Sequence, residues 1–390
     1  MQFEKQCMDW GKEFLDGLKL PISYSNSAAA AAMFHEYVLN RALREIDLSD
    51  KKSIEHHKLL IDKLGRDILL SQLEEVPMHG IVVLGEGEKD DSHAFLYGER
   101  IGGLKHDIDL QFDIVIDQVE GTSRIIKGEN GVFKGTMCVQ LYAQRNSILP
   151  VPGTYGLQVA VSSRAKGALD ISKPIEENAK NIAQAYGCKI SALRFAFINR
   201  DRSQKDISTL LGLGVPDENI TRYKAGSIEQ TMRLAYESCN KNDNNLVLWS
   251  VNGTPEGIIS AAIVKFLRGD FAMMINPEYE KDPKRIEVIN LQAQERGVDI
   301  SKGKIYRLDE ILKGDCAVFA TGITDPACLI YSKQDITGKD TAVVNGLPGV
   351  VFKNGKLYAH TRMFLSTGSR REFAKENYIF EPHLQMRFGL

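Results

Sequence analysis

Apolar side chains recur at helical spacing through roughly the first seventy residues. One helix is predicted within 27–43, where five alanines precede larger apolar side chains, because alanine is the best helix former and allows close packing. A second helix is predicted over 54–73, where Ile61, Leu64 and Ile68 fall on one stripe. The chain is therefore expected to begin with two closely packed helices rather than with a flexible linker.

Strand-like runs follow up to about residue 161. The apolar stretches 80–84 and 112–116 are typical of buried strands. After about residue 170, helical stretches alternate with short strand-like runs at 193–198, 245–251 and 317–320, which is the pattern of an α/β chain. From about residue 335 a glycine-rich, strand-like pattern returns.

These changes of pattern predict two domains. Residues 1–170 are expected to form an N-terminal α+β domain, and residues 171–334 a C-terminal α/β domain. Residues 335–390 either rejoin the first domain, which we favour, or form an edge of the second. The length of 390 residues agrees with this division, since a prior of about 150 residues per domain favours two or three domains.

Composition and charge exclude several function classes. The 49 basic and 51 acidic residues give a net charge of -2, so no electrostatic argument favours nucleic acid or an anionic membrane as a partner. The six cysteines are far apart and form no Cys-x-x-Cys pair, which disfavours a zinc site and fits a reducing compartment. No leader pattern and no run of about eighteen apolar residues is present, so we expect a cytoplasmic protein without a membrane span.

Two acidic turns follow the two predicted buried strands. The first is Gly85-Glu86-Gly87-Glu88-Lys89-Asp90-Asp91, and the second lies within 113–122. Carboxylates gathered in this way repel one another unless cations lie between them. Hard divalent ions such as Mg²⁺ and Mn²⁺ take oxygen ligands and keep positions open for water and phosphate. The two turns therefore predict part of a metal site for phosphoryl transfer to water.

Gly121 and Thr122 add a phosphate-binding feature to the second turn. Glycine lets the backbone approach an anion, and a helix that starts at the next residue offers free N–H groups. Thr122 could orient the attacking water. A third acidic turn carries Glu256 at a predicted helix start, where an acidic helix cap is the simpler interpretation. Asp113, inside a strand, is by itself more typical of a paired structural acid.

The sequence resembles the class II fructose-1,6-bisphosphatases, within the lithium-sensitive sugar and inositol phosphatase superfamily. The resemblance runs from about Asn26 to Arg371. Four motifs in the same order carry it, namely Gly85-Glu86-Gly87-Glu88, Asp117-x-x-Glu120-Gly121-Thr122, 254–262 (Thr-Pro-Glu-Gly-Ile-Ile-Ser-Ala-Ala) and 320–324 (Ala-Thr-Gly-Ile-Thr). Several motifs in one order are far more specific than any one of them.

The resemblance implies roles for individual residues. The family has a lysine and, four residues later, an aspartate upstream of its first motif, and these fall on Lys58 and Asp62, which would otherwise be interpreted as an exposed ion pair. The implied metal ligands are Asp62, Glu86, Asp117 and Glu256, with Glu120 as a weaker candidate. The implied catalytic residues are Lys58, Asp90 and Thr122, and the implied substrate-binding residues are Gly121, Thr122, Tyr155, Arg200 and Arg202.

Three departures from the family pattern concern mainly the substrate. Gln118 stands where the family usually has proline, and Asn252 replaces one glycine of the third turn. A sugar-contacting Asp-Gly-Asp element aligns with Lys224-Ala225-Gly226, which would lose two hydroxyl acceptors and gain a cation. Because a site that hydrogen-bonds hydroxyl groups discriminates strongly, this change could alter which sugar phosphate is accepted. A shift of the alignment in this loop is equally compatible with the sequence.

The resemblance implies an α/β (α+β) fold, a layered α-β-α-β-α sandwich of two domains with the site in the cleft between them. It implies hydrolysis of the 1-phosphate of fructose 1,6-bisphosphate with Mg²⁺ or Mn²⁺, as in gluconeogenesis, by a homodimer or homotetramer. The alternatives are the same chemistry on sedoheptulose 1,7-bisphosphate or an inositol phosphate, and a catalytically silent homologue that binds sugar phosphate. The expected partner is a small sugar bisphosphate, with no nucleic acid and no membrane.

Overall fold

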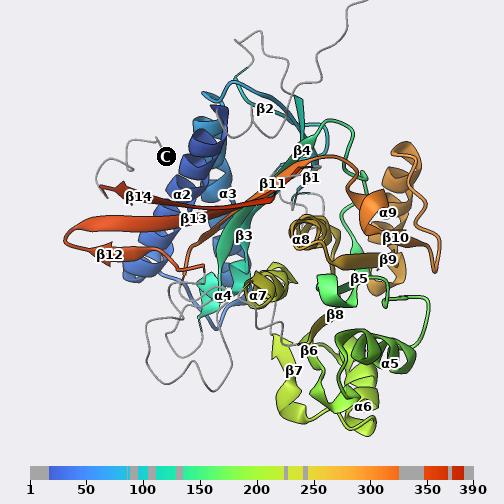
Figure 1. Ribbon diagram of the computed structural model, residues 1–390. Coiled ribbons are helices and arrows are strands. Elements are labelled where there is room, and N and C mark those ends of the chain that lie inside the picture. The colour runs from blue at the N-terminus through green and yellow to red at the C-terminus, as the bar shows by residue number, and fades with distance from the viewer. Residues whose placement is uncertain are drawn as a thin grey trace, which may run out of the picture.

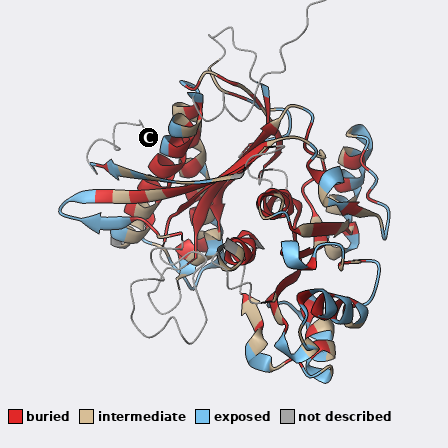
Figure 2. Ribbon diagram, in the orientation of Figure 1, coloured by how far each residue is buried: buried red, intermediate tan, exposed pale blue. Residues whose placement is uncertain are grey.

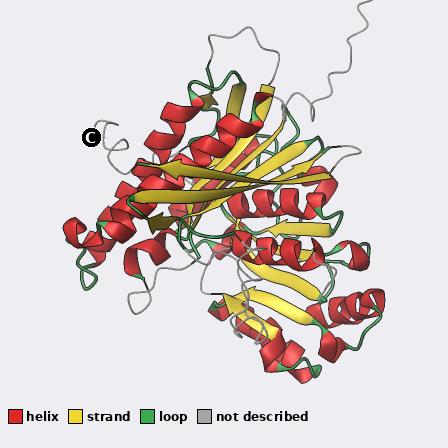
Figure 3. Cartoon of the chain, turned by 60° about the vertical axis from the view of Figure 1, so that its left-hand side comes forward, coloured by secondary structure: helices red, strands yellow, loops and turns green. Residues whose placement is uncertain are grey.

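The fold consists of five alternating layers of helices and sheets (Figures 1 and 3). The structure is a computed structural model, and it describes residues 17–85, 87, 95–103, 111–128, 135–223, 227–239, 245–324, 347–367 and 371–381. Within these residues one sheet has eight strands and the other has six. No helix in these ranges combines the length and the apolar character needed to span a bilayer.

The larger sheet mixes parallel and antiparallel strands. Its order is β12-β13-β11-β4-β3-β1-β2, and β14 pairs with β13. β1 and β3 are parallel, whereas β3 pairs antiparallel with β4. The strands are β1 (His79–Gly85), β2 (Arg100–Ile101), β3 (Gln111–Glu120), β4 (Met137–Gln144), β11 (Cys316–Gly322), β12 (Val351–Lys353), β13 (Lys356–Ser366) and β14 (Arg371–Phe380).

The smaller sheet has the order β10-β9-β5-β8-β6-β7. Its strands are β5 (Tyr155–Val161), β6 (Arg194–Ile198), β7 (Ile220–Tyr223), β8 (Leu246–Gly253), β9 (Asp270–Ile275) and β10 (Ile305–Arg307). The strand-like runs predicted at 193–198, 245–251 and 317–320 correspond to β6, β8 and β11.

Helices cover the outer faces of both sheets and fill the space between them. The helices are α2 (Lys19–Phe34), α3 (Lys51–Leu73), α4 (Thr122–Lys127), α5 (Ile175–Tyr186), α6 (Gln204–Gly212), α7 (Ser227–Cys239), α8 (Thr254–Phe266), α9 (Pro283–Glu295) and α10 (Leu308–Ile311). A π-helical turn, His35–Leu39, continues α2. Three apolar clusters separate the layers: α2 and α3 pack on the larger sheet, α5 and α6 on the smaller, and α7 and α8 between the two.

This arrangement confirms the predicted α-β-α-β-α sandwich. The alanine run lies inside α2, where residues 28–32 are all buried, so small side chains let the helix lie close to the sheet. The predicted helix over 54–73 is α3, which starts at Lys51 because the side chain of Asp50 caps its first turn. The cluster between the sheets contains residues from both sheets. The division into two domains therefore stays a prediction.

Asp113 is a structural acid, as its position inside a strand suggested. Its side chain is 1% exposed and forms an ion pair with Arg145. It also accepts hydrogen bonds from the backbone N–H groups of Ser147, at 2.9 Å, and Ile148, at 3.1 Å. These contacts fix the turn that follows β4.

We predict that Asp113→Ala lowers the free energy of unfolding by about 3 kcal/mol, because it leaves buried donors without their acceptor. Chemical denaturation followed by circular dichroism measures the change. Asp67→Ala is the control, since Asp67 forms an exposed pair with Lys63 on α3 and should contribute less than about 1 kcal/mol. Equal effects of the two substitutions would contradict the structural role of Asp113.

Gln118 and Gln140 lie on neighbouring strands, and both side chains are fully buried. Gln140 donates to Asn26 at 3.0 Å and accepts from Tyr142. Gln118 packs against Gly65 of α3, and neither atom of its amide has a hydrogen bond among the described residues. A buried amide without partners costs free energy, so the two glutamines should respond in opposite ways to an apolar replacement.

We predict that Gln118→Met leaves the free energy of unfolding unchanged or raises it by about 1 kcal/mol, whereas Gln140→Met lowers it by about 1–3 kcal/mol. Denaturant unfolding of both variants beside the wild type measures the difference. A marked loss of stability in Gln118→Met would show that the amide has a partner.

Candidate active site

The last residues of β3 place two carboxylates on one face of the larger sheet. Asp117 pairs with Val139 of β4, and Glu120 pairs with Met137, so three steps along β3 match two steps along β4. The extra residue is a β-bulge. Residues three apart on a regular strand would face opposite sides, but the bulge brings Glu120 to the side of Asp117.

Both carboxylates face the layer between the sheets. Opposed residues of an antiparallel pair share a face, and Val139 and Met137 belong to the apolar cluster between the sheets. Asp117 is 0% exposed and Glu120 is 4% exposed. Burial and the negative charge of Asp117 raise the pKa of the Cys138 thiol well above its ordinary value. Two buried carboxylates therefore share one face where β3 ends.

The turn after β3 leads into α4 and contacts α3. Gly121 has φ 89°, a backbone conformation that glycine adopts without strain, and α4 begins at Thr122. The Thr122 hydroxyl lies 2.9 Å from the carbonyl oxygen of Val119 and 3.4 Å from Oδ1 of Asp62. Asp62 and Thr122 are 60 residues apart in the chain. The structure thus brings together two of the predicted site residues.

Lys58 forms its ion pair with Glu55 and not with Asp62. Nζ of Lys58 lies 2.9 Å from Oε1 of Glu55, one turn earlier on α3. The Lys58 side chain is 23% exposed. The exposed pair that the spacing alone would suggest is therefore not formed, since Asp62 contacts the turn after β3. The site roles implied for Lys58 and Asp62 stay predictions.

Glu256 lies in the first turn of α8, the helix between the two sheets. It is 8% exposed, and its carboxylate folds back over Gly253, where a Cβ atom would lie 2.2 Å from Oε2. The position also matches an acidic helix start, with Pro255 in the first turn. Tyr155 pairs directly with Gly253 across β5 and β8, so it lies beside the turn that carries Glu256.

Arg202 is stacked between two tyrosines near this turn. Its guanidinium carbon lies 5.2 Å from the ring centre of Tyr155 and 5.5 Å from that of Tyr279. Nη2 of Arg202 also donates to the carbonyl oxygen of Val251 at 3.0 Å. Burial lowers the pKa of Arg202, and the neighbouring Arg200 lowers it further, while Tyr155 opposes the shift. Burial raises the pKa of Tyr279, because it disfavours the charged phenolate.

Part of the predicted site belongs to segments outside the described residues. Glu86 and Asp90 lie outside the described residues, as do residues 224–226. Gly85, the last residue of β1, precedes Glu86 and pairs with Ile116 of β3. Ile116 is the residue before Asp117. Among the described residues no group of three His, Cys, Asp or Glu side chains is close enough to hold a metal ion. The described part of the chain therefore supplies only some of the predicted ligand set.

Three residues near the predicted site were not expected from the sequence. Tyr279 follows β9 and carries no motif, so nothing in the sequence links it to Arg202. Arg124 lies two residues after Thr122 and forms an ion pair with Glu229 of α7 at 2.7 Å. For Arg124, the only signal in the sequence was its position in the helix that starts at Thr122, directly after the second acidic turn.

Comparison with known proteins gives consistent matches. Residues 52–346 match the family described as bacterial fructose-1,6-bisphosphatase, glpX-encoded. Fructose-1,6-bisphosphatase 2 class 2 of Escherichia coli K12 is 31% identical over 288 residues, which are 72% of this chain and 85% of that protein. Fructose-1,6-bisphosphatase 1 class 2 of the same strain is 27% identical over 281 residues, which are 70% of this chain and 80% of that protein.

A cyanobacterial protein is similar to a comparable extent. D-fructose 1,6-bisphosphatase class 2/sedoheptulose 1,7-bisphosphatase of Synechococcus sp. strain JA-2-3B'a(2-13) is 28% identical over 279 residues, which are 68% of this chain and 77% of that protein. The family match includes all three acidic turns and most of both sheets. The chain therefore belongs to the class II fructose-1,6-bisphosphatase family.

Proposed function

We propose that this chain is a metal-dependent phosphatase that hydrolyses the 1-phosphate of fructose 1,6-bisphosphate to fructose 6-phosphate and phosphate. The observation that carries the proposal is the end of β3, within the segment that matches the family. There, two buried carboxylates share one face and are followed by a turn whose Thr122 contacts Asp62. This combines acids suited to a metal with a backbone suited to a phosphate.

The donor set fits a hard divalent cation. Asp62, Glu86, Asp117 and Glu256, with Glu120, would hold Mg²⁺ or Mn²⁺ through carboxylate oxygens. Burial of several acids is costly without positive charge nearby, and Asp117, Glu120 and Glu256 are all buried. When bound, such a cation offsets phosphoryl charge and acidifies a water molecule.

The protein residues would orient the reactants and handle charge. The Thr122 hydroxyl donates to Val119, which leaves its lone pairs able to accept a hydrogen bond from the attacking water. Lys58 would stabilise charge on the phosphoryl group, and Asp90 would help to handle the proton. Water attacks phosphorus, the bond from phosphorus to the sugar oxygen breaks, and that oxygen takes up a proton.

The substrate would be held from the smaller sheet. Tyr155, Arg200 and Arg202 are suited to the distal phosphate, because arginine binds phosphate with a planar pair of donors and the stacked tyrosines restrict Arg202. Gly121 would let the backbone approach the reacting phosphate.

A homodimer or homotetramer and a cytoplasmic location also stay predictions.

Sedoheptulose 1,7-bisphosphate is the second candidate substrate. One observation favours it, since the similar Synechococcus protein is named for both activities. Lys224-Ala225-Gly226, outside the described residues, aligns with a sugar-contacting element of the family, and this departure bears on the choice between the two substrates.

The direct test is phosphate release from fructose 1,6-bisphosphate, sedoheptulose 1,7-bisphosphate and inositol phosphates, with Mg²⁺, with Mn²⁺ and with excess chelator. We expect turnover of a sugar bisphosphate that chelator abolishes and added metal restores. Asp117→Asn should lower kcat by about 100-fold or more, because a charged ligand is lost. The control is Asp67→Asn, which also neutralises an aspartate but lies on the exposed face of α3. It should leave kcat unchanged.

Two outcomes would reject parts of this proposal. Absence of turnover on every substrate, with metal binding intact, would favour the catalytically silent homologue. Unchanged turnover in Asp117→Asn would reject the assignment of the site while leaving the activity standing.

We predict that Arg202→Lys raises KM for the preferred bisphosphate about tenfold and leaves kcat within about threefold. Lysine keeps the charge but loses the planar donors and the stacking on both tyrosines. Steady-state kinetics measures both constants. Arg222→Lys is the control, because Arg222 pairs with the exposed Asp217 and should leave both constants unchanged. An unchanged KM in Arg202→Lys would remove Arg202 from the substrate site.

A further inference from the structure

Arg124 and Glu229 form an ion pair between the short helix that follows β3 and the helical layer between the sheets. Arg124 belongs to α4, directly after the β3 turn, and Glu229 belongs to α7 (Figure 1). The Nη1 to Oε2 distance is 2.7 Å, and the two side chains are 22% and 7% exposed. The residues are 105 positions apart, so only the tertiary fold brings them together.

Two glycines enclose this ion pair. A Cβ atom on Gly135 would lie 2.2 Å from Nη1 of Arg124 and 3.3 Å from Oε2 of Glu229. A Cβ atom on Gly121 would lie 3.0 Å from Nε of Arg124. The guanidinium therefore occupies the space next to the backbone of both glycines, and Gly121 is a residue that we expect to approach the phosphate.

The pair connects two parts of the site proposed above. Arg124 lies two residues after Thr122, so its contact with Glu229 connects the first turn of α4 to α7. Glu229 is held in turn, because α7 packs on α8, where Thr231 and Ser260 form a hydrogen bond of 2.8 Å. α7 begins directly after residues 224–226, and α8 carries Glu256.

We propose that Arg124 and Glu229 are positioning residues for phosphate hydrolysis, which hold the Gly121–Thr122 turn at a fixed place against α7. This inference rests on the proposed function. Displacing a catalytic group by about 1 Å can cost about 100-fold in rate. Tyr155, at the start of β5, and Arg202, in the turn after β6, lie elsewhere, so binding of the distal phosphate should depend little on the pair.

The test is steady-state kinetics of Arg124→Gln, Glu229→Gln and the double variant with the preferred sugar bisphosphate and metal. Each single variant should lower kcat about 30-fold or more, with KM within about threefold, since an interaction that orients the reacting groups is lost. The double variant should be no slower than the slower single variant, because both substitutions break the same contact. Arg124→Lys should recover part of the rate, because it keeps the charge without the planar donors.

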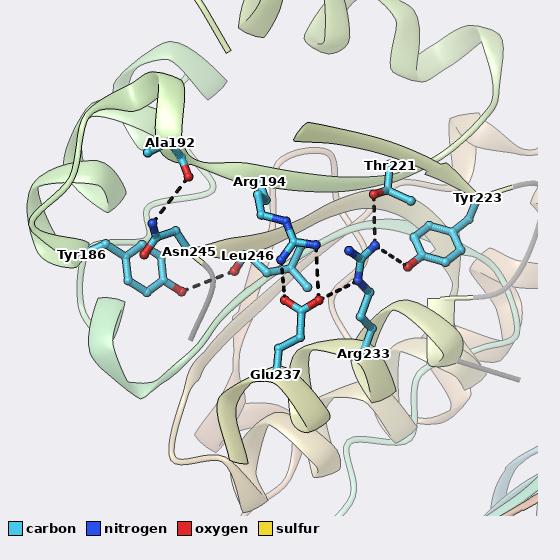
Figure 4. A network of polar contacts seen from close by, with 9 residues as sticks. All are labelled: Tyr186, Ala192, Arg194, Thr221, Tyr223, Arg233, Glu237, Asn245 and Leu246. Atoms are coloured by element: carbon cyan, nitrogen blue, oxygen red, sulfur yellow. Dashed lines mark hydrogen bonds and ion pairs between the residues drawn. The ribbon is translucent and has the colours of Figure 1, made fainter. Parts of the chain in front are cut away.

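A second ion pair of α7, between Glu237 and Arg194 of β6, serves as a control. Arg194 and Glu237 are 2.8 Å apart with side-chain exposures of 20% and 19%, and they lie in a separate network with Arg233 near the far end of α7 (Figure 4). Arg194→Gln therefore breaks a similar ion pair on α7 that does not contact α4. It should leave kcat within about twofold of wild type.

Gly135→Ala perturbs the pair without removing a charge. Its new Cβ atom would displace the Arg124 guanidinium, and alanine at φ 73° also strains the backbone there, so a fall in kcat supports the inference only together with a fall in Arg124→Gln or Glu229→Gln. Thermal unfolding of every variant shows whether it is folded under assay conditions. If Arg124→Gln or Glu229→Gln does not fold, Arg124→Lys carries the comparison, with a kcat below that of the wild type expected.

The outcomes separate the two proposals. If the wild type hydrolyses none of the substrates, the proposed function fails and this inference fails with it. If the wild type is active and the folded variants keep kcat within threefold, the inference is overturned and the function stands. An equal loss in Arg194→Gln, or a loss that follows the unfolded fraction, would also overturn it, because either result indicates a structural role alone.

Discussion

Close packing of α8 between the two sheets is the constraint on which the rest of the structure depends. Of its residues only Lys265 is not buried, and that side chain donates to the carbonyl oxygens of Leu312 and Gly314 at 2.9 and 2.6 Å (Figure 2). Gly257 and the small residues at 260–262 let elements from both sheets approach the helix. Because α8 touches both sheets, its first turn brings Glu256 to the layer that Asp117 and Glu120 also face.

The acids reach this layer through local irregularities rather than through regular structure. A regular strand would separate Asp117 from Glu120, and the bulge in β3 removes that separation at the cost of one ladder pairing. Gly121 then turns the chain with a positive φ, and Thr122 lies within reach of Asp62. Asp113 lies on the same strand but is fully engaged with Arg145 and two backbone N–H groups. Strand position alone therefore does not distinguish a structural acid from a candidate ligand.

Much of the fold could be predicted because its elements are specified locally. The apolar stripe of α3, the alanine run of α2 and the continuous apolar runs of β1 and β3 each follow from periodicity over a few turns or residues. The layered order was implied by the family resemblance, not by these patterns. The start of α2 at Lys19, well before the alanine run, could not be predicted from the sequence. Leu20 and Tyr24 are exposed, so the apolar side chains of this first part do not form a continuous buried stripe. The predicted domain division has no matching break in the core, since the apolar cluster between the sheets contains residues from both of them.

The sequence by itself determined the acidic turns, their order along the chain and the family, because glycine turns, apolar runs and motif spacing are local properties. Only the tertiary structure decided which side chains meet. Lys58 contacts Glu55 rather than Asp62, Arg202 stacks on Tyr155 and Tyr279, and Arg124 pairs with Glu229. These contacts depend on how helices and sheets pack across long separations in the chain, and packing at native density depends on the shapes of all the layers together.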